Sequence, residues 1–309
     1  MLGATLLPVI LTGEMRNAMT FDVEDYFHVG AFADRVDKSQ WASFPSRVEA
    51  NTERSLALFS EAGCKGTFFI LGWVAENFPH IVKRIAAEGH EIACHSSEHR
   101  RVYQLSPDQF REDTIRAKKV IEDVSGTRVS GYRAPSFSIT ADSLWAFEIL
   151  AETGFSYDSS IFPVRHPNYG MPKLPRTPFL VKTPSGPIIE YPMPTLSVGS
   201  HRSPLAGGAY LRLLPYAYTR WGIRFLNDCE EQSVCIYAHP WELDPEQPRI
   251  NGSLTAKMRH YIGLGTMEKK LRRLLQDFQF VTLESLLPSV ERLGFVLDTR
   301  NLDQVAIFR

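Results

Sequence analysis

Two histidines spaced by four residues, and a cluster of acids about 70 residues before them, are the side chains best suited to chemistry. The segment "HSSEH" places His95 and His99 on one face of a helical turn, so both imidazoles can reach one metal ion. Two histidines and one carboxylate, with open positions for water, are typical of a catalytic site for zinc or a similar divalent ion. Two surface histidines on a polar turn would show the same spacing.

The segment "TFDVED" offers the carboxylate that such a site needs. On a strand, Asp22 and Glu24 point to the same side, so one could bind the metal while the other takes a proton from water. That division of labour suits hydrolysis. Asp25 is a rival ligand if the strand has ended at Glu24. The structural alternative is that these acids cap a helix that follows the strand.

Two later motifs could complete a hydrolytic site. In "GYRAPSF", Arg133 could pair with a buried carboxylate, and the backbone N–H of Ser136 could donate to an oxyanion. In "CIYAHPWELD", His239 ends an apolar strand and is a candidate general acid that protonates a leaving amine. Asp158 of "YDSS" could keep that histidine protonated. An ordinary turn and a core histidine bonded to backbone are the corresponding structural interpretations.

The elements that must position these residues alternate along the chain. Apolar runs predict strands that include 19–23, 66–72, 91–95, 129–137, 233–239 and 278–283. Amphipathic stretches predict helices over 49–62, 79–90, 106–126, 139–155, 216–231 and 266–278. This alternation predicts an α/β fold with a parallel sheet or barrel. The ligand site of such folds lies beyond the carboxyl ends of the strands, where the polar clusters fall.

The alternation breaks over residues 163–215, which hold 11 of the 20 prolines. A stretch of that length without helical periodicity predicts a β-rich or loop insertion that shapes a groove. Side chains in or near it could then contact a substrate, namely Arg165, His166, Tyr169, His201 and Arg202.

Composition limits the class of protein and its partners. The chain has 309 residues, enough for one large domain or two ordinary ones, and a net charge of −1 argues against a nucleic-acid partner. Its four cysteines form no CxxC pair, which favours reduced thiols. The short apolar run at 6–11 lacks a basic region ahead of it, and no segment is long enough to span a membrane. We therefore expect a cytoplasmic protein, with its oligomeric state left open.

These motifs, in this order, resemble the polysaccharide deacetylase family, also called the NodB-homology or carbohydrate esterase family 4 domain. The matching text is "TFDVED" (20–25), "HSSEH" (95–99), "RAPS" (133–136), "YDSS" (157–160) and "IYAHP" (236–240). A closer similarity is to the branch found with exopolysaccharide loci, including those linked to exosortase systems. That similarity rests on "TFDVEDYFHV", "GYRAPSFSI", "DSSIFP" and "HPWELDPEQPR".

The resemblance implies a distorted (β/α)7 barrel and metal-dependent removal of an acetyl group, usually from an N-acetylated sugar. One divalent ion is expected, most readily Zn²⁺, with Co²⁺ or Ni²⁺ as alternatives, and no other cofactor. Carried over residue by residue, the family's roles fall on Asp22 as general base, His95 and His99 as metal ligands, Arg133 as the residue that orients the base, His239 as general acid and Asp158 as the partner of that acid.

The sequence departs from the family pattern in three motifs. Val23 stands where a second adjacent aspartate is usual, and the Asp-x-Asp spacing of some relatives favours Glu24 over Asp25 as the metal ligand. Ile161 and Phe162 stand where Asp-Trp is usual, and the "RAPS" motif has serine where an aromatic residue is common. The substrate groove is therefore expected to differ from that of chitin or peptidoglycan deacetylases.

The sequence thus predicts a hydrolase that N-deacetylates an amino sugar of a bacterial polysaccharide or its lipid-linked precursor. Two alternatives remain open: a metal-independent amide hydrolase of cyclic ureides or imides on the same scaffold, and an inactive carbohydrate-binding relative. The expected organisation is a leader or extra strand at 1–17, a catalytic domain at 18–290 with the 163–215 insertion, and a C-terminal extension at 291–309 packed on the domain.

Overall fold

One large sheet organises the molecule. The computed structural model describes residues 15–300 apart from 34, 167–168, 200, 206 and 289–291. The strands follow the order β10–β1–β2–β3–β4–β5–β7–β6–β12, and β11 also pairs with β1. Their bounds are β1 Arg16–Val23, β2 Thr67–Ile70, β3 Glu91–Cys94, β4 Gly131–Tyr132, β5 Tyr157–Asp158, β6 Phe179–Thr183, β7 Gly186–Glu190, β10 Cys235–Ala238, β11 Gln279–Val281 and β12 Val296–Asp298.

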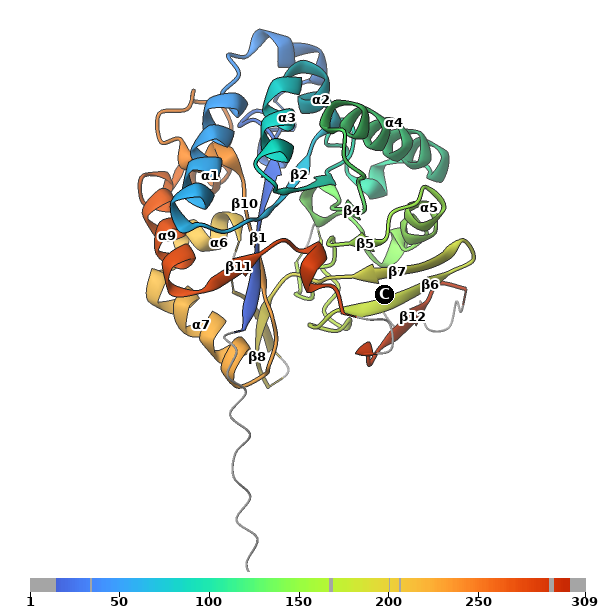
Figure 1. Cartoon of the computed structure of the whole chain (residues 1–309). Helices are drawn as coiled ribbons and strands as arrows, with labels where there is room; N and C mark the ends of the chain where they lie inside the picture. The colour runs from blue at the N-terminus through green and yellow to red at the C-terminus, as the bar shows by residue number, and fades with distance from the viewer. Residues whose placement is uncertain are drawn as a thin grey trace, which may run out of the picture.

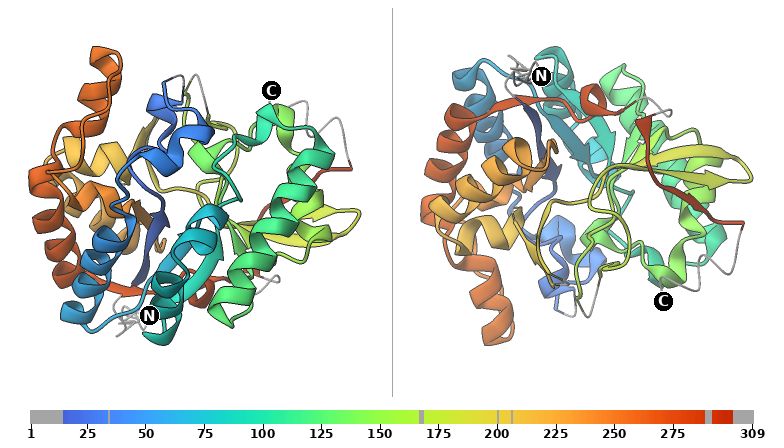
Figure 2. Two further views of the ribbon diagram at one scale, coloured as in Figure 1. Left: turned by 90° about the horizontal axis from the view of Figure 1, so that it is seen from above. Right: turned by 90° about the horizontal axis from the view of Figure 1, so that it is seen from below.

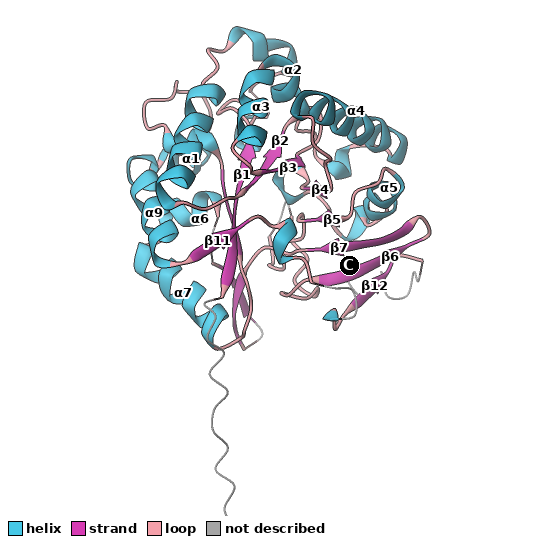
Figure 3. Ribbon diagram, in the orientation of Figure 1, coloured by secondary structure: helices cyan, strands magenta, loops and turns pink. Residues whose placement is uncertain are grey.

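Helices cover the part of the sheet from β10 to β4, while β6, β7 and β12 lie at one edge of the molecule (Figures 1 and 3). Views from above and below show the same arrangement, with helices around the strands (Figure 2). The helices are α1 Val48–Ala62, α2 Gly72–Asn77, α3 Pro79–Ala87, α4 Pro107–Ser125, α5 Ala146–Glu152, α6 Gly208–Leu213, α7 Tyr216–Asp228, α8 Leu254–Tyr261 and α9 Leu264–Asp277. No described helix is both long and apolar enough to cross a membrane.

The strand register brings the predicted site residues to one edge of the sheet. Every described pairing in the large sheet is parallel except the β6–β7 hairpin. Phe21 of β1 pairs with Ala238 of β10, and Cys94 of β3 pairs with Tyr132 of β4, so these strands end at nearby levels. The predicted α/β class with a parallel sheet is confirmed. Among the described residues, no pairing joins β10 to β12 and closes the strands into a full ring.

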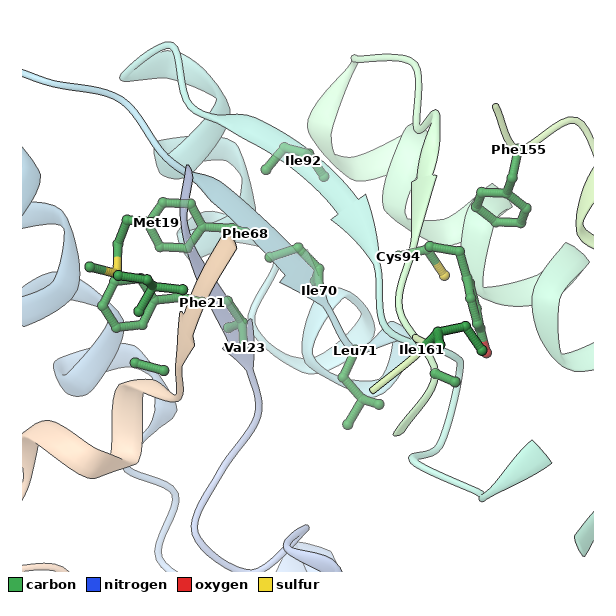
Figure 4. Packing of buried hydrophobic residues seen from close by; sticks show 14 of the residues in the cluster. Met19, Phe21, Val23, Phe68, Ile70, Leu71, Ile92, Cys94, Phe155 and Ile161 are labelled. Carbon is green, nitrogen blue, oxygen red and sulfur yellow. The ribbon is translucent and has the colours of Figure 1, made fainter. Parts of the chain in front are cut away.

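Aromatic side chains fill the space between the sheet and its helices. Phe21 and Phe68 stack with ring centroids 5.7 Å apart, and Phe59 of α1 meets both rings edge-on. Figure 4 shows this packing, with Met19, Val23, Ile70 and Ile92 around it. Because β1 is covered on both faces, its residues from Asn17 to Val23 are all buried, and the strand that carries Asp22 is rigid.

Most predicted elements are present, and one is wrong. The helix predicted over 139–155 is split into a 3₁₀ turn at Ala141–Ser143 and α5. Thr140 and Ser143 cap each other's backbone N–H groups, which closes a separate turn before α5 begins. By contrast, α4 begins with the capping box of Ser106 and Gln109 and ends at Gly126, close to its predicted bounds.

The insertion is rich in β-structure, as predicted. It contains β6, β7, the hairpin of β8 (Thr195–Val198) and β9 (His201–Pro204), and the short helix α6. In the C-terminal extension, β12 pairs with β6 in parallel. The predicted leader falls mostly outside the described residues, but Arg16 and Asn17 already belong to β1.

The stacked aromatic core yields a stability prediction. Phe68 is fully buried between β1 and α1, and removing its ring would leave a cavity there. We expect Phe68→Ala to lower the free energy of unfolding by about 3–5 kcal/mol, measured by chemical denaturation. Ile115→Ala on α4, where the side chain is half exposed, is the control and should change it by less than about 1 kcal/mol. Equal losses in both variants would contradict this account of the core.

Candidate active site

A cavity of about 430 Å³ lies at the carboxyl ends of the strands. Its size is typical of a small-molecule site. Six residues singled out from the sequence line it, together with several aromatic side chains. These six are Asp22, Glu24, His95, His99, Ser136 and His239. The structure therefore brings together residues from four segments that are distant in the sequence.

Glu24, His95 and His99 form a cluster that could hold a metal ion. One ligand atom from each lies within 4.8 Å of the others. The Nδ1 atom of His95 contacts the carbonyl oxygen of Arg133 at 2.8 Å, which leaves its Nε2 for a metal. Trp241 Nε1 donates to Glu24 Oε1 at 3.2 Å and orients the carboxylate. Two imidazoles and one carboxylate in a buried pocket fit a catalytic divalent ion.

The pKa values of His95 and Glu24 favour neutral imidazole and ionised carboxylate, the forms that bind a metal. Burial lowers the pKa of His95 to about 4. Burial alone would raise the pKa of Glu24, but the charge and hydrogen bond of His99, at 2.8 Å, leave it well below its usual range. His95 and Glu24 are therefore both in the form that binds a cation.

Asp25, the rival ligand, points away from the cluster. Its Oδ2 accepts hydrogen bonds from the Ser46 hydroxyl at 2.6 Å and from the backbone N–H groups of Arg47 and Val48 at 2.8 and 3.1 Å. These amides begin α1, so Asp25 caps a helix that starts more than twenty residues later. The expectation of Asp25 as a metal ligand is therefore wrong, and Glu24 takes that place in the cluster.

His28 has a structural role next to the cluster. Its Nδ1 accepts the backbone N–H of Asp25 at 2.9 Å, and its ring packs edge-on against the indoles of Trp41 and Trp73. Burial lowers the pKa of His28 to about 3, so the ring is neutral. This packing role agrees with the position of His28 outside the cluster.

Arg133 forms a buried ion pair with Asp22. Arg133 Nη1 donates to Asp22 Oδ1 at 2.7 Å, and both side chains are almost completely buried. The guanidinium is also held by Ser159, whose carbonyl and hydroxyl accept from Nε and Nη2 at 3.1 Å each. Asp22 Oδ1 is therefore engaged, while Oδ2 faces His239 Nε2 at 4.0 Å across the cavity.

His239 is held by a carboxylate that the sequence analysis did not identify. Its Nδ1 lies 3.1 Å from Glu242 Oε2, and Arg212 Nε donates to Glu242 Oε1 at 2.5 Å. Arg212 in turn donates to the carbonyls of residues 259, 260 and 262, which fixes its position. The spacing His-x-x-Glu at the start of a helical turn, a capping-box pattern, was the available signal.

These contacts set the charge states of His239 and Glu242. Burial, the largest single influence on His239, lowers its pKa, but the hydrogen bond and charge of Glu242, with Glu24 and Asp22, raise it overall to about 9. Burial would raise the pKa of Glu242, but the charges of Arg212 and His239 lower it to about 2. Nε2 of His239 is therefore a proton donor directed into the cavity.

Asp158 does not contact His239, so the expected pairing is wrong. Its carboxylate accepts the hydroxyl and the backbone N–H of Ser160 at 2.7 and 3.0 Å. It also hydrogen-bonds Glu190, its partner in the register of β5 and β7, and burial raises the pKa of both acids. Ser160 Oγ accepts the Ala134 N–H at 2.8 Å. Asp158 therefore supports the loop that carries Arg133.

Two loops at the cavity have constrained backbones. Five described residues other than glycine have positive φ, and four of them lie here: Ser96, His99, Ser136 and Phe137. Such conformations are costly and concentrate at functional sites. Ser136, at φ 56°, lines the cavity directly after Pro135.

Aromatic residues form the walls of the cavity. Phe137, Tyr169, Tyr210, Tyr237 and Trp241 line it. Of the five polar residues proposed around the insertion, His166 and Tyr169 reach the cavity and their rings stack at 3.7 Å. Arg165, His201 and Arg202 are not among the lining residues. Of the five lining aromatic residues, Tyr169 and Tyr210 lie outside the motif text that carries the family resemblance.

Comparisons with known proteins agree with this site. Residues 32–157 match the polysaccharide deacetylase family, and residues 159–288 match a domain of unknown function, DUF3473. A peptidoglycan-N-acetylglucosamine deacetylase of Bacillus cereus is 36% identical over 98 residues, which cover 31% of this chain and 36% of that protein. A peptidoglycan deacetylase-like protein of Gibberella zeae is 36% identical over 97 residues, covering 31% and 28%. The chain thus spans about a third of the length of these relatives.

The fold is also found among solved structures. A crystal structure of a provisionally named polysaccharide deacetylase from Mycobacterium smegmatis superposes with a TM-score of 0.54 at 23% identity. The superposition covers 90% of this chain and 96% of that chain. This likeness shows a shared fold and agrees with the expected distorted-barrel architecture.

The contrast between the two neighbouring acids is directly testable. We expect Glu24→Ala to reduce the affinity for Zn²⁺ by more than about 100-fold, because it removes a ligand and not merely an outer-shell partner. Asp25→Ala should retain the metal but lower the free energy of unfolding by about 2 kcal/mol, because α1 loses its cap. Metal analysis and chemical denaturation of both variants provide the measurements. Loss of metal in Asp25→Ala alone would contradict the assignment.

Proposed function

Residues 32–157 match the polysaccharide deacetylase family, in agreement with the resemblance inferred from the motifs, and from this match we propose a metal-dependent N-deacetylase. Its substrate is an acetylated amino sugar of a bacterial polysaccharide or its lipid-linked precursor. The observation that carries the proposal is that Asp22 and His239 face each other at 4.0 Å beside the Glu24–His95–His99 cluster. A base, an acid and a metal cluster in one cavity are the parts that amide hydrolysis requires.

Glu24, His95 and His99 would hold the ion. When bound, a divalent ion there polarises the acetyl carbonyl and acidifies water. Co²⁺, Ni²⁺ and Zn²⁺ all suit this donor set, and Zn²⁺ is our first choice. The names of the curated relatives, one of them a peptidoglycan-N-acetylglucosamine deacetylase, support an acetamido sugar as the substrate.

Asp22 acts as the general base. Arg133 occupies its Oδ1, so Oδ2 is the oxygen available to accept a proton from the attacking water. The ion pair fixes the orientation of this carboxylate, so no rotation is needed before proton transfer. The water oxygen forms a bond to the acetyl carbon as its proton passes to Asp22.

His239 and Ser136 act on the other side of the acetyl group. Nε2 of His239 donates a proton to the amide nitrogen, the C–N bond breaks, and acetate and the free amine are released. Glu242 holds Nδ1 and stabilises the charged imidazole before that transfer. The backbone N–H of Ser136 donates to the carbonyl oxygen as negative charge develops on it.

Three narrower expectations remain predictions. The first is membership in the branch found with exopolysaccharide loci, and the second is a cytoplasmic location. The third is the division into a leader, a catalytic domain and a C-terminal extension. The absence of a membrane-spanning helix among the described residues is compatible with several locations.

Metal removal separates this proposal from a metal-independent hydrolase of cyclic imides. We expect dialysis against a chelator to abolish acetate release from N-acetylated oligosaccharides, and one equivalent of Zn²⁺ to restore it. The physical reason is that the bound ion polarises the acetyl carbonyl, and Glu24, His95 and His99 do not do so without it. Full activity after verified metal removal would favour the alternative hydrolase.

Acid and base roles can be separated with two substrates. We expect Asp22→Asn to abolish hydrolysis of both an N-acetylated oligosaccharide and p-nitrophenyl acetate while retaining the metal, because both reactions need an activated water. His239→Ala and Glu242→Gln should lower kcat on the amide by about 10²–10⁴-fold and on the ester far less. The nitrophenolate leaves without a proton, so the ester does not need the acid.

Glu246→Gln is the matched control for Glu242→Gln, because Glu246 is an exposed glutamate four residues further on. It should leave both reactions unchanged. Equal losses on amide and ester in His239→Ala would contradict the role of His239 as a general acid.

A further inference from the structure

Two arginines in the wall of the active-site cavity have no acidic partner. Arg101 and Arg259 both line the cavity. Within the described part of the chain, neither forms an ion pair with a carboxylate within 4.0 Å. Elsewhere the chain pairs arginines freely on its surface, as Arg116 does with Glu76. Other described arginines, such as Arg224, also lack such a partner, so it is the position of Arg101 and Arg259 in the cavity wall that calls for an explanation.

Arg101 lies against the loop that carries Ser136. Its Nη2 donates to the carbonyl of Gly30 at 3.2 Å. A methyl group built on Gly30 would lie 2.9 Å from Arg101 Nη2 and 3.0 Å from Ser136 Oγ. The guanidinium and the serine hydroxyl thus flank the same glycine, whose missing side chain allows their close approach. Arg101 is therefore next to the proposed oxyanion donor.

Arg259 approaches the same region from α8. That helix packs on the 3₁₀ turn Gly30–Phe32, since the ring of Phe32 lies 5.0 Å from His260. Arg259 is exposed, and its charge acts on the hydroxyl of Tyr169 in the cavity wall. One arginine is bonded to this turn and the other stands on the helix that packs against it.

The remaining charges of the cavity are already matched. Asp22 is paired with Arg133, and Glu242 with Arg212 and His239. Glu24 belongs to the metal cluster. Arg101 and Arg259 are thus surplus positive charge in a chain whose net charge is −1, so overall composition does not account for them. A guanidinium offers paired N–H donors that match the oxygens of a carboxylate or phosphate.

We propose that the substrate carries an anionic group close to its acetamido sugar, bound by Arg101 and Arg259. The shared chemistry is an oxyanion: the carboxylate of an acidic sugar or a phosphate ester on the sugar. This inference rests on the proposed deacetylase function and narrows its substrate class from amino sugars to acidic amino-sugar glycans or phosphorylated precursors. Charge would then contribute to selection among acetylated sugars as well as to binding.

Matched neutral and anionic substrates test the inference. For the carboxylate, the pair is chitotetraose and a hyaluronan tetrasaccharide; for the phosphate, it is N-acetylglucosamine and its 1-phosphate. We expect kcat/KM for acetate release to be about tenfold higher for the anionic member of at least one pair. That selectivity should fall as salt is raised from 0.05 to 0.3 M, because ions screen the arginines. The pair that responds identifies the source of the anion.

Variants locate the selectivity. Arg101→Gln and Arg259→Gln should each reduce the anionic-to-neutral ratio of kcat/KM at least about fivefold. Arg224→Gln on α7, an exposed arginine outside the cavity lining, is the control and should leave the ratio unchanged. Equal losses on both members of a pair would assign Arg101 and Arg259 to structural support and overturn the inference, as would a wild-type preference for neutral sugars.

A binding measurement keeps the inference separate from the proposed function. If no substrate releases acetate, the deacetylase proposal fails, and calorimetric titration of the same sugars still tests the anion site. Tighter binding of the anionic sugar that is lost in Arg101→Gln and Arg259→Gln supports the inference. Equal affinities for both members of each pair overturn it.

Discussion

The buried ion pair between Arg133 and Asp22 is the interaction on which the rest of the site depends. A fully buried guanidinium is costly unless its charge and its N–H groups are satisfied. Here Asp22 and Thr20 of β1 accept from Nη1 at 2.7 Å each, Ser159 accepts from Nε and Nη2, and the ring of Phe69 lies 4.0 Å below. The same contacts tie the ends of β4 and β5 to β1, which is not their neighbour in the sheet, and leave one oxygen of Asp22 facing the cavity.

Around this pair, three acids in one short segment acquire three different environments. Asp22 meets a permanent cation, Glu24 meets two imidazoles and an indole N–H, and Asp25 meets the first amides of α1. Chemically similar side chains therefore have different parts, with Asp22 proposed as the base, Glu24 proposed as the ligand and Asp25 capping a helix, because their neighbours differ. The end of β1 at Val23 creates this separation, since the chain turns there and the pleat no longer aligns the acids.

The site spans both matched families. Glu24 precedes residue 32, where the deacetylase match begins; His95 and His99 lie inside it; and His239 with Glu242 lies in the DUF3473 match. The proposed general acid, His239, therefore lies in the second half of the chain, where Arg212 contacts Glu242 and Glu242 contacts His239. That half also supplies most of the aromatic side chains that line the cavity, including Tyr169.

Sequence alone determined the strand–helix alternation, the parallel sheet and the residues gathered at its edge. These follow from local patterns: apolar runs, caps, and the fixed direction of side chains on strands and turns. Tertiary structure decided between Glu24 and Asp25, because the amides that capture Asp25 belong to residues 47 and 48. It also decided the partner of His239, because the register of β5 and β7 commits Asp158 to Glu190. Which of several similar carboxylates contacts a given group depends on backbone that is distant in the sequence, and local sequence patterns do not encode that proximity.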